Sequence, residues 1–80
     1  MSAFTNRREF QYRRIRDLRE EHDLTQAQVA DYLGMGRSQY ASYERGIRPI
    51  PVSALPLLAK LYHTSVDYLL GLTDAPRPYL

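Results

Sequence analysis

The chain has 80 residues, of which 44% are hydrophobic and 25% are charged, and this size fits at most one small globular domain. It contains no cysteine, which excludes disulfides and thiolate metal sites. No apolar run approaches the roughly 20 residues that a membrane span needs, and arginine supplies nearly all of the positive charge behind a formal net charge of +2.

The first predicted helix begins within residues 6–10 and ends at His22. Asn6 is a suitable N-cap because its side chain can accept a hydrogen bond from the backbone, and Glu9 follows three residues later. The apolar spacing predicts that the inner face of this helix carries Tyr12, Ile15, Leu18 and the stem of Arg19.

Several arginines cluster on this helix, among them Arg13, Arg14 and Arg16. Because arginine binds phosphate bidentately, the cluster could clamp phosphates. A solvated helix face that is balanced by neighbouring acidic residues is an equally good interpretation.

A second helix is predicted from Gln26 to Leu33, with Thr25 as its N-cap. Its buried side would consist of Val29, Ala30 and Leu33. Gly34 ends this helix, because glycine readily adopts the left-handed conformation that closes a helix.

A third helix is predicted from Arg37 to about Arg45, with Gly36 as its N-cap. One face of this helix carries mostly small or polar side chains together with cationic ones. Its residues are Arg37, Ser38, Ala41, Ser42 and Arg45. Tyr40 and Tyr43 lie on another, bulky face. A helix that packs on a small domain and enters a DNA major groove needs this division.

A fourth helix is predicted from near Ser53 to near Tyr62, after a loop that Pro49 and Pro51 keep extended. Pro56 then falls in the first turn, where the backbone N–H groups have no partner within the helix and proline is tolerated.

A fifth helix is predicted to begin at Ser65 and to stop at Gly71. Its apolar contacts would be Val66, Leu69 and Leu70. The residues that follow, with their two prolines, are typical of a tail.

These five helices, with the second and third forming a helix-turn-helix, resemble the phage repressor and Cro-type family, also called the XRE family. The resemblance rests on three segments in the expected order: RIRDLREEHDLTQAQVADYLG, RSQYASYERG and LAKLYHTSVDYLLGLTD. It implies an all-α fold, with a five-helix repressor-like DNA-binding domain at residues 11–74, an N-terminal extension at 1–10 and a C-terminal tail at 75–80. The chain departs from the family at Gly36, usually Ser or Thr, at Tyr40 and Tyr43, usually aliphatic, and at His22-Asp23, where a glycine is usual.

The resemblance also implies roles for individual residues. Base edges would be read by Arg37, Ser38 and Ser42. The family's phosphate-contacting positions match Gln26, Gln39, Arg45, Arg48 and Ser53. At the two glutamines, the resemblance also allows contact with a base. A structural ion pair between the first and third helices matches Arg19 and Glu44.

The resemblance therefore predicts a sequence-specific transcriptional regulator, a repressor, that binds double-stranded DNA at a near-palindromic operator. The alternative is an antitoxin-like module that binds a toxin and autoregulates its operon, because fold does not fix function. Only residues 1–10 and 75–80 are free to form a toxin-binding segment, which disfavours this alternative.

Nothing in the sequence points to an enzyme, a cofactor, a metal site or a small-molecule ligand: no nucleophile has a plausible base, and His22 and His63 are isolated. The first ten residues lack the apolar core of a secretory signal. We therefore expect a cytoplasmic, nucleoid-associated protein that has no membrane contact.

A weak homodimer through the C-terminal part is also expected. Tyr68 and Leu72 have no predicted internal partner, and Tyr79 and Leu80 add apolar surface. A frayed tail on a monomer that dimerises only on DNA is the alternative.

Overall fold

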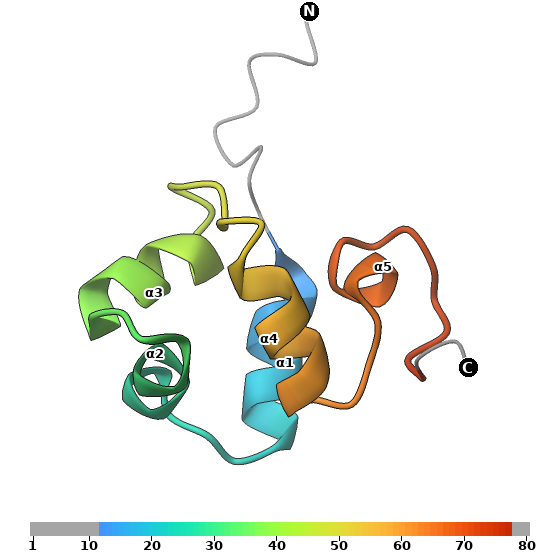
Figure 1. Ribbon diagram of the computed structural model, residues 1–80, viewed down its shortest axis with the longest axis horizontal. Coiled ribbons are helices and arrows are strands. Elements are labelled where there is room, and N and C mark those ends of the chain that lie inside the picture. The colour runs from blue at the N-terminus through green and yellow to red at the C-terminus, as the bar shows by residue number, and fades with distance from the viewer. Residues whose placement is uncertain (1–11, 78–80) are drawn as a thin grey trace, which may run out of the picture.

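The computed structural model describes residues 12–77, and these form five α-helices and no strand (Figure 1). The helices are α1 (Arg13–Glu21), α2 (Gln26–Leu33), α3 (Arg37–Glu44), α4 (Ala54–Leu61) and α5 (Val66–Leu69). The predicted all-α, five-helix class is therefore confirmed. Within residues 12–77, no helix is long and apolar enough to cross a membrane.

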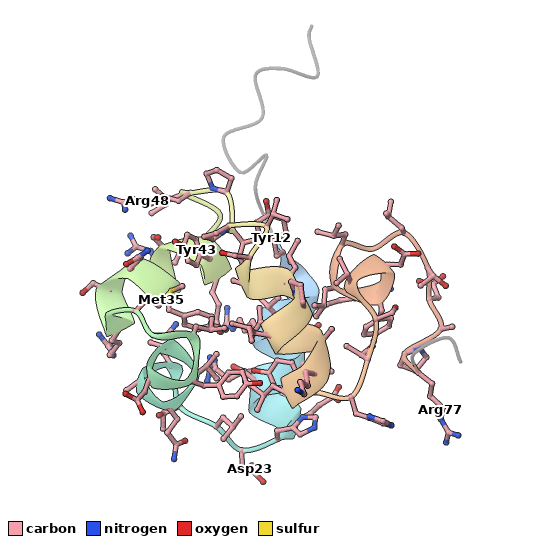
Figure 2. All side chains as sticks on the ribbon, viewed as in Figure 1. Tyr12, Asp23, Met35, Tyr43, Arg48 and Arg77 are labelled. Atoms are coloured by element: carbon pink, nitrogen blue, oxygen red, sulfur yellow. The ribbon has the colours of Figure 1, made fainter. Side chains whose placement is uncertain are left out.

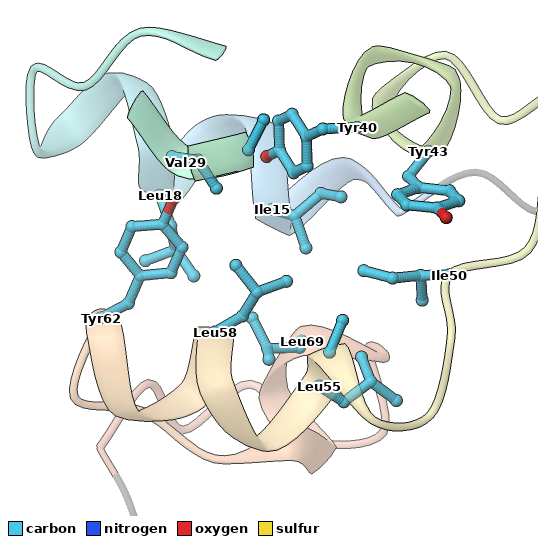
Figure 3. Close-up of a cluster of buried hydrophobic side chains, with 12 residues drawn as sticks. Ile15, Leu18, Val29, Tyr40, Tyr43, Ile50, Leu55, Leu58, Tyr62 and Leu69 are labelled. Atoms are coloured by element: carbon cyan, nitrogen blue, oxygen red, sulfur yellow. The ribbon is translucent and has the colours of Figure 1, made fainter. Parts of the chain in front are cut away.

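One apolar cluster holds these helices together. α2 packs against α3, α4 packs against α5, and α1 contacts both α3 and α5. Ile15 of α1, Tyr40 of α3 and Leu58 of α4 are fully buried at the centre of the cluster (Figure 3). Because aromatic rings bury a large apolar area, Tyr40 and Tyr43 fill this core in place of the aliphatic residues usual in the family.

Two helix starts follow the predicted capping chemistry. The Thr25 side chain accepts a hydrogen bond from the Gln28 backbone N–H at 3.0 Å. The Thr25 N–H in turn donates to the Gln28 side chain at 2.8 Å, which completes a capping box. At α5, the Ser65 hydroxyl accepts from the Tyr68 N–H at 3.0 Å. Local sequence therefore defines where α2 and α5 begin.

At two of the other helices, the start of α1 and the capping of α4 differ from the prediction. α1 begins at Arg13 rather than within residues 6–10, because Tyr12 has φ −116° and ψ 80°, outside the helical region. The expected cap Asn6 lies outside the described residues. Ser53 precedes α4 as predicted, but it makes no side-chain capping bond, since its own backbone is already helical at φ −65° and ψ −22°.

All five described helices end with the same type of backbone closure. A residue in the left-handed conformation follows each helix, and these residues are Asp23, Gly34, Gly46, His63 and Gly71. The next residue donates its N–H to the carbonyl five positions earlier, at 2.8–3.0 Å. The predicted glycine stops at Gly34 and Gly71 are confirmed, and Asp23 and His63 adopt this conformation without being glycine.

The segment after α5 folds back against α1 instead of leaving the domain. The Arg14 guanidinium donates to the Tyr68 carbonyl at 3.0 Å and to the Thr73 carbonyl, and it lies 2.6 Å from the Asp74 carboxylate. It also stacks on the Tyr68 ring at 4.1 Å from the centroid. The expectation that Tyr68 lacks an internal partner is therefore wrong, because Arg14 supplies one.

The same segment is held a second time, by a hydrogen bond from the Thr64 hydroxyl to the Pro76 carbonyl. Leu70, predicted to be an apolar contact of α5, is instead exposed, because it lies one residue beyond the helix end. Tyr79 and Leu80, expected to add apolar surface, lie outside the described residues.

Candidate nucleic-acid interface

α2, the turn at residues 34–36 and α3 form one packed unit (Figure 1). Val29 and Ala30 of α2 and Tyr40 of α3 are buried against each other in the shared cluster. Met35 in the turn is partly buried against the same cluster. The turn is therefore anchored by an apolar side chain between two glycines, and it fixes the direction in which α3 leaves α2.

The first turn of α3 points its polar side chains to solvent. Arg37, Ser38 and Gln39 are all exposed, whereas Tyr40, Tyr43 and Glu44 are buried on the opposite side. Gly36 is the N-cap residue, and it has no side chain that could accept a hydrogen bond from the helix. The free N–H groups of the first turn therefore face solvent. The positive end of the helix and a cationic side chain thus lie on one surface, which favours an anionic or hydrogen-bonding partner.

Ser42 does not lie on this exposed surface, although the sequence predicts it there. Its exposed fraction is 9%, and its hydroxyl donates to the Gln39 carbonyl at 2.6 Å. After α3, the N–H groups of Ile47 and Arg48 both point to the backbone carbonyl of Ser42, so this carbonyl also has partners within the chain. The face read from helical periodicity is therefore interrupted at Ser42, which the fold buries.

Gln39 has a partner that the sequence analysis missed. Its side-chain amide donates to the Tyr43 hydroxyl at 2.9 Å, one helical turn further on. The four-residue spacing of the two residues was the available signal, because side chains at i and i+4 meet on a helix surface. The amide of Gln39 is consequently oriented before any ligand arrives.

Beneath α3, a cluster of hydrogen bonds centres on Glu44. Arg19 of α1 meets its carboxylate through two nitrogens, at 2.7 and 3.2 Å. The Tyr40 hydroxyl donates to the same carboxylate at 2.5 Å, and the Gln26 amide donates at 3.1 Å. The two residues that the resemblance pairs thus lie in contact, and Gln26, expected at phosphate, joins them through its amide.

The protonation states follow from this geometry. Burial on its own would raise the pKa of Glu44, but hydrogen bonds from Arg19, Tyr40 and Gln26 outweigh it and hold that pKa below its ordinary value. The hydrogen bond with Glu44 raises the pKa of Arg19. Burial, followed by the hydrogen bond to Glu44, raises the pKa of Tyr40. The carboxylate is therefore charged, and the tyrosine is neutral, at neutral pH.

The remaining predicted residues lie at the end of α3 and beyond it. Arg45, Arg48 and Ser53 are exposed, and Arg48 points away from the body of the molecule (Figure 2). On α1, Arg16 is exposed and pairs with Glu20 at 3.3 Å. Arg14 is engaged with the C-terminal segment, so Arg14 and Arg16 have different partners and do not form one phosphate clamp.

The helix-turn-helix family profile matches residues 15–69 of the chain. The chain is 48% identical over 65 residues to the uncharacterized HTH-type transcriptional regulator YobD of Bacillus subtilis, which covers 81% of this chain and 58% of that protein. It is 39% identical over 58 residues to the cryptic phage CTXphi transcriptional repressor RstR of Vibrio cholerae, covering 72% of this chain and 52% of the repressor.

A third relative is similar over most of its length. The control protein C.SmaI of Serratia marcescens is 36% identical over 68 residues, which cover 85% of this chain and 81% of the relative. The chain spans about half the length of the other relatives named above. No solved structure matches the chain.

Proposed function

Because the chain belongs to the phage repressor and Cro-type helix-turn-helix family, we propose that it is a sequence-specific transcriptional regulator, a repressor, that binds double-stranded DNA. One observation supports this most strongly. The start of α3 carries three exposed polar residues, Arg37, Ser38 and Gln39, on a helix whose opposite side is buried in the core.

In this proposal α3 lies in the major groove, which is wide enough for an α-helix. Arg37 reads a base edge, and guanine suits it best because its guanidinium can donate to O6 and N7 together. Ser38 contacts a neighbouring base edge. Ser42 is not part of this reading set, since its hydroxyl is buried and already donates to a backbone carbonyl.

Phosphate contacts would orient the domain on the duplex. Arg45 and Arg48 are the exposed cations at the end of α3 and in the loop that follows, and Ser53 is exposed beside the start of α4. Gln26 keeps one amide N–H and its carbonyl oxygen after bonding Glu44, so it can donate to a phosphate at the start of α2.

One α3 helix covers only a short half-site, so useful specificity requires two copies on a near-palindrome. We therefore include a weak homodimer in the proposal, with two α3 helices about 34–36 Å apart along the duplex.

The test is a salt titration of binding to duplexes that the protein selects from a random pool. Each neutralised phosphate contributes roughly −0.9 to the log–log slope, so Arg45 and Arg48 together predict about −2 per protomer. The double variant Arg45→Gln, Arg48→Gln should flatten the slope by that amount. Failure to select any duplex at low salt, or binding that ignores salt, would overturn the proposal.

A further inference from the structure

We propose that Gln39 reads an adenine in the major groove and that the Tyr43 hydroxyl is the positioning group that holds its amide for this contact. The inference rests on the proposed function and adds the base that is read and the residue that orients its reader. Its basis is the 2.9 Å hydrogen bond from the exposed Gln39 amide to the Tyr43 hydroxyl.

Tyr43 offers a fixed acceptor. The residue is 4% exposed and its ring belongs to the buried cluster that also contains Ile50 and Tyr40 (Figure 3). Because core packing fixes the orientation of the Tyr43 ring, the position of its hydroxyl is also fixed. The hydrogen bond therefore orients the amide of Gln39, and Gln39 does not orient Tyr43.

The Gln39 amide that Tyr43 holds, here called the tethered amide, keeps one donor and one acceptor for a ligand. With one N–H given to Tyr43, Gln39 retains one N–H donor and a carbonyl acceptor. In the major groove adenine alone presents a donor and an acceptor on one base, at N6 and N7, whereas guanine presents two acceptors. Phosphate oxygens are acceptors only, so they would leave the carbonyl of the tethered amide unpaired.

The neighbouring position supports the same assignment. Ser42, which the periodicity places on the reading surface, donates its hydroxyl proton to the backbone carbonyl of Gln39 at 2.6 Å, which leaves the side-chain amide of Gln39 untouched. Gln39 is thus the exposed polar side chain next to Ser38, whereas Ser42 is withdrawn into the fold. An amide that is already oriented loses less conformational freedom on binding than a free glutamine does.

The experiment compares the single-base preferences of four variants with those of the wild type, on the duplex that the wild type selects. Gln39→Ala should lose preference at one A·T pair, about five- to one-hundred-fold, and keep its preferences elsewhere. Tyr43→Phe retains the ring and should lose preference at the same pair, with no further loss in the double variant. Tyr32→Phe is the matched control: it removes a hydroxyl that donates to the Leu57 carbonyl at 3.2 Å, away from α3, and should change nothing.

A second measurement needs no DNA. The side-chain amide resonances of Gln39 should show restricted motion in the wild type and gain mobility in Tyr43→Phe, while circular dichroism verifies that this variant is folded. Equal losses on all sequences would indicate a phosphate contact and overturn the adenine assignment. Unchanged preference in Gln39→Ala, while the wild type still selects a site, would overturn the inference alone; a wild type that selects no site would overturn it together with the proposed function.

Discussion

At the scale of single residues, the polar interior depends on Glu44. Its side chain is 3% exposed, and an unpaired carboxylate at such a position would be strongly destabilising. Its partners come from α1, α2 and α3 itself, since they are Arg19, Gln26 and Tyr40. One carboxylate therefore fixes the placement of α3 relative to both preceding helices.

The free energy of unfolding at acidic pH should reflect the protonation of the Glu44 carboxylate. The pKa of Glu44 is lower in the folded state than its ordinary value of 4.5, so its contribution is complete above that value and is lost as the pH falls through the folded pKa. Glu44→Gln should cost about 3–5 kcal/mol at pH 7, because it leaves Arg19 without its charged partner. The variant should then lose less stability than the wild type between neutral and acidic pH.

Glu20→Gln provides the control for this measurement. Glu20 is an exposed carboxylate that pairs with Arg16 at 3.3 Å and lies 3.9 Å from Arg19 without a hydrogen bond to it, and such exposed pairs contribute about 0–1 kcal/mol. Urea unfolding at a series of pH values would measure all three proteins. Parallel stability profiles for wild type and Glu44→Gln would contradict the assigned role of Glu44.

Alanine substitutions of Arg37 and Arg48 should have different effects, because Arg37 is proposed to read a base and Arg48 to bind a phosphate. Arg37 lies on the first turn of α3, so Arg37→Ala should remove about 1–3 kcal/mol of discrimination at one base pair. Arg48 lies in the loop after α3, so Arg48→Ala should weaken all sequences alike and reduce the salt slope by about 1. Affinities for selected and scrambled duplexes distinguish the two outcomes. If Arg37→Ala weakened both duplexes equally, Arg37 would not read a base.

At the scale of elements, two glycines in the helix-turn-helix have different tasks. Gly34 has φ +73° and ends α2, and Gly36 has φ −73° and precedes α3. A Cβ at either position would meet no atom within 4 Å, so neither glycine is required for space. The backbone conformation alone separates them, because an L-residue is strained only at Gly34.

Substitution at these glycines should therefore have opposite effects. Gly34→Ala should lower the free energy of unfolding by about 1–2 kcal/mol through the left-handed conformation that it must adopt. Gly36→Ser should keep or raise stability by a few tenths of a kcal/mol, since serine can cap the free N–H groups of α3. Thermal and urea unfolding would measure both variants. A Gly34→Ala protein as stable as the wild type would contradict this account of the turn.

At the scale of the whole molecule, the end of α5 is the region that a second copy would cover. Leu72 is 72% exposed and Leu70 is 40% exposed, immediately after the helix. The segment that carries Leu72 is held in place by the Arg14 and Thr64 contacts, so its apolar side chain is presented on an ordered backbone. Exposed apolar side chains on an ordered surface favour association.

Leu72→Glu should therefore shift the proposed dimer toward monomer, because two copies would bring the introduced charges together at a two-fold interface. Val52→Glu is the matched control, as Val52 is 80% exposed but lies before α4. Sedimentation equilibrium over a range of concentrations would measure both. A wild type that stays monomeric at the highest concentration, or equal effects of the two substitutions, would remove α5 as the interface.

The sequence by itself determined the elements that depend on near neighbours. The start of α2 at Thr25, the stops at Gly34 and Gly71 and the tolerance of Pro56 in α4 involve only residues within one or two turns of the chain. Capping bonds and left-handed closures form within such short spans, so their residue types are sufficient to predict them. The helix-turn-helix spacing follows from these local signals.

The tertiary structure alone decided which exposed positions remain exposed and which polar groups meet. Ser42 has the periodicity of a surface residue, but its side chain is buried in the folded protein. Arg14 meets Asp74 across 60 positions, and no local pattern indicates that contact. Such pairings depend on how the helices pack around Ile15, Tyr40 and Leu58, because packing brings together side chains whose separation along the chain carries no information about their distance in space.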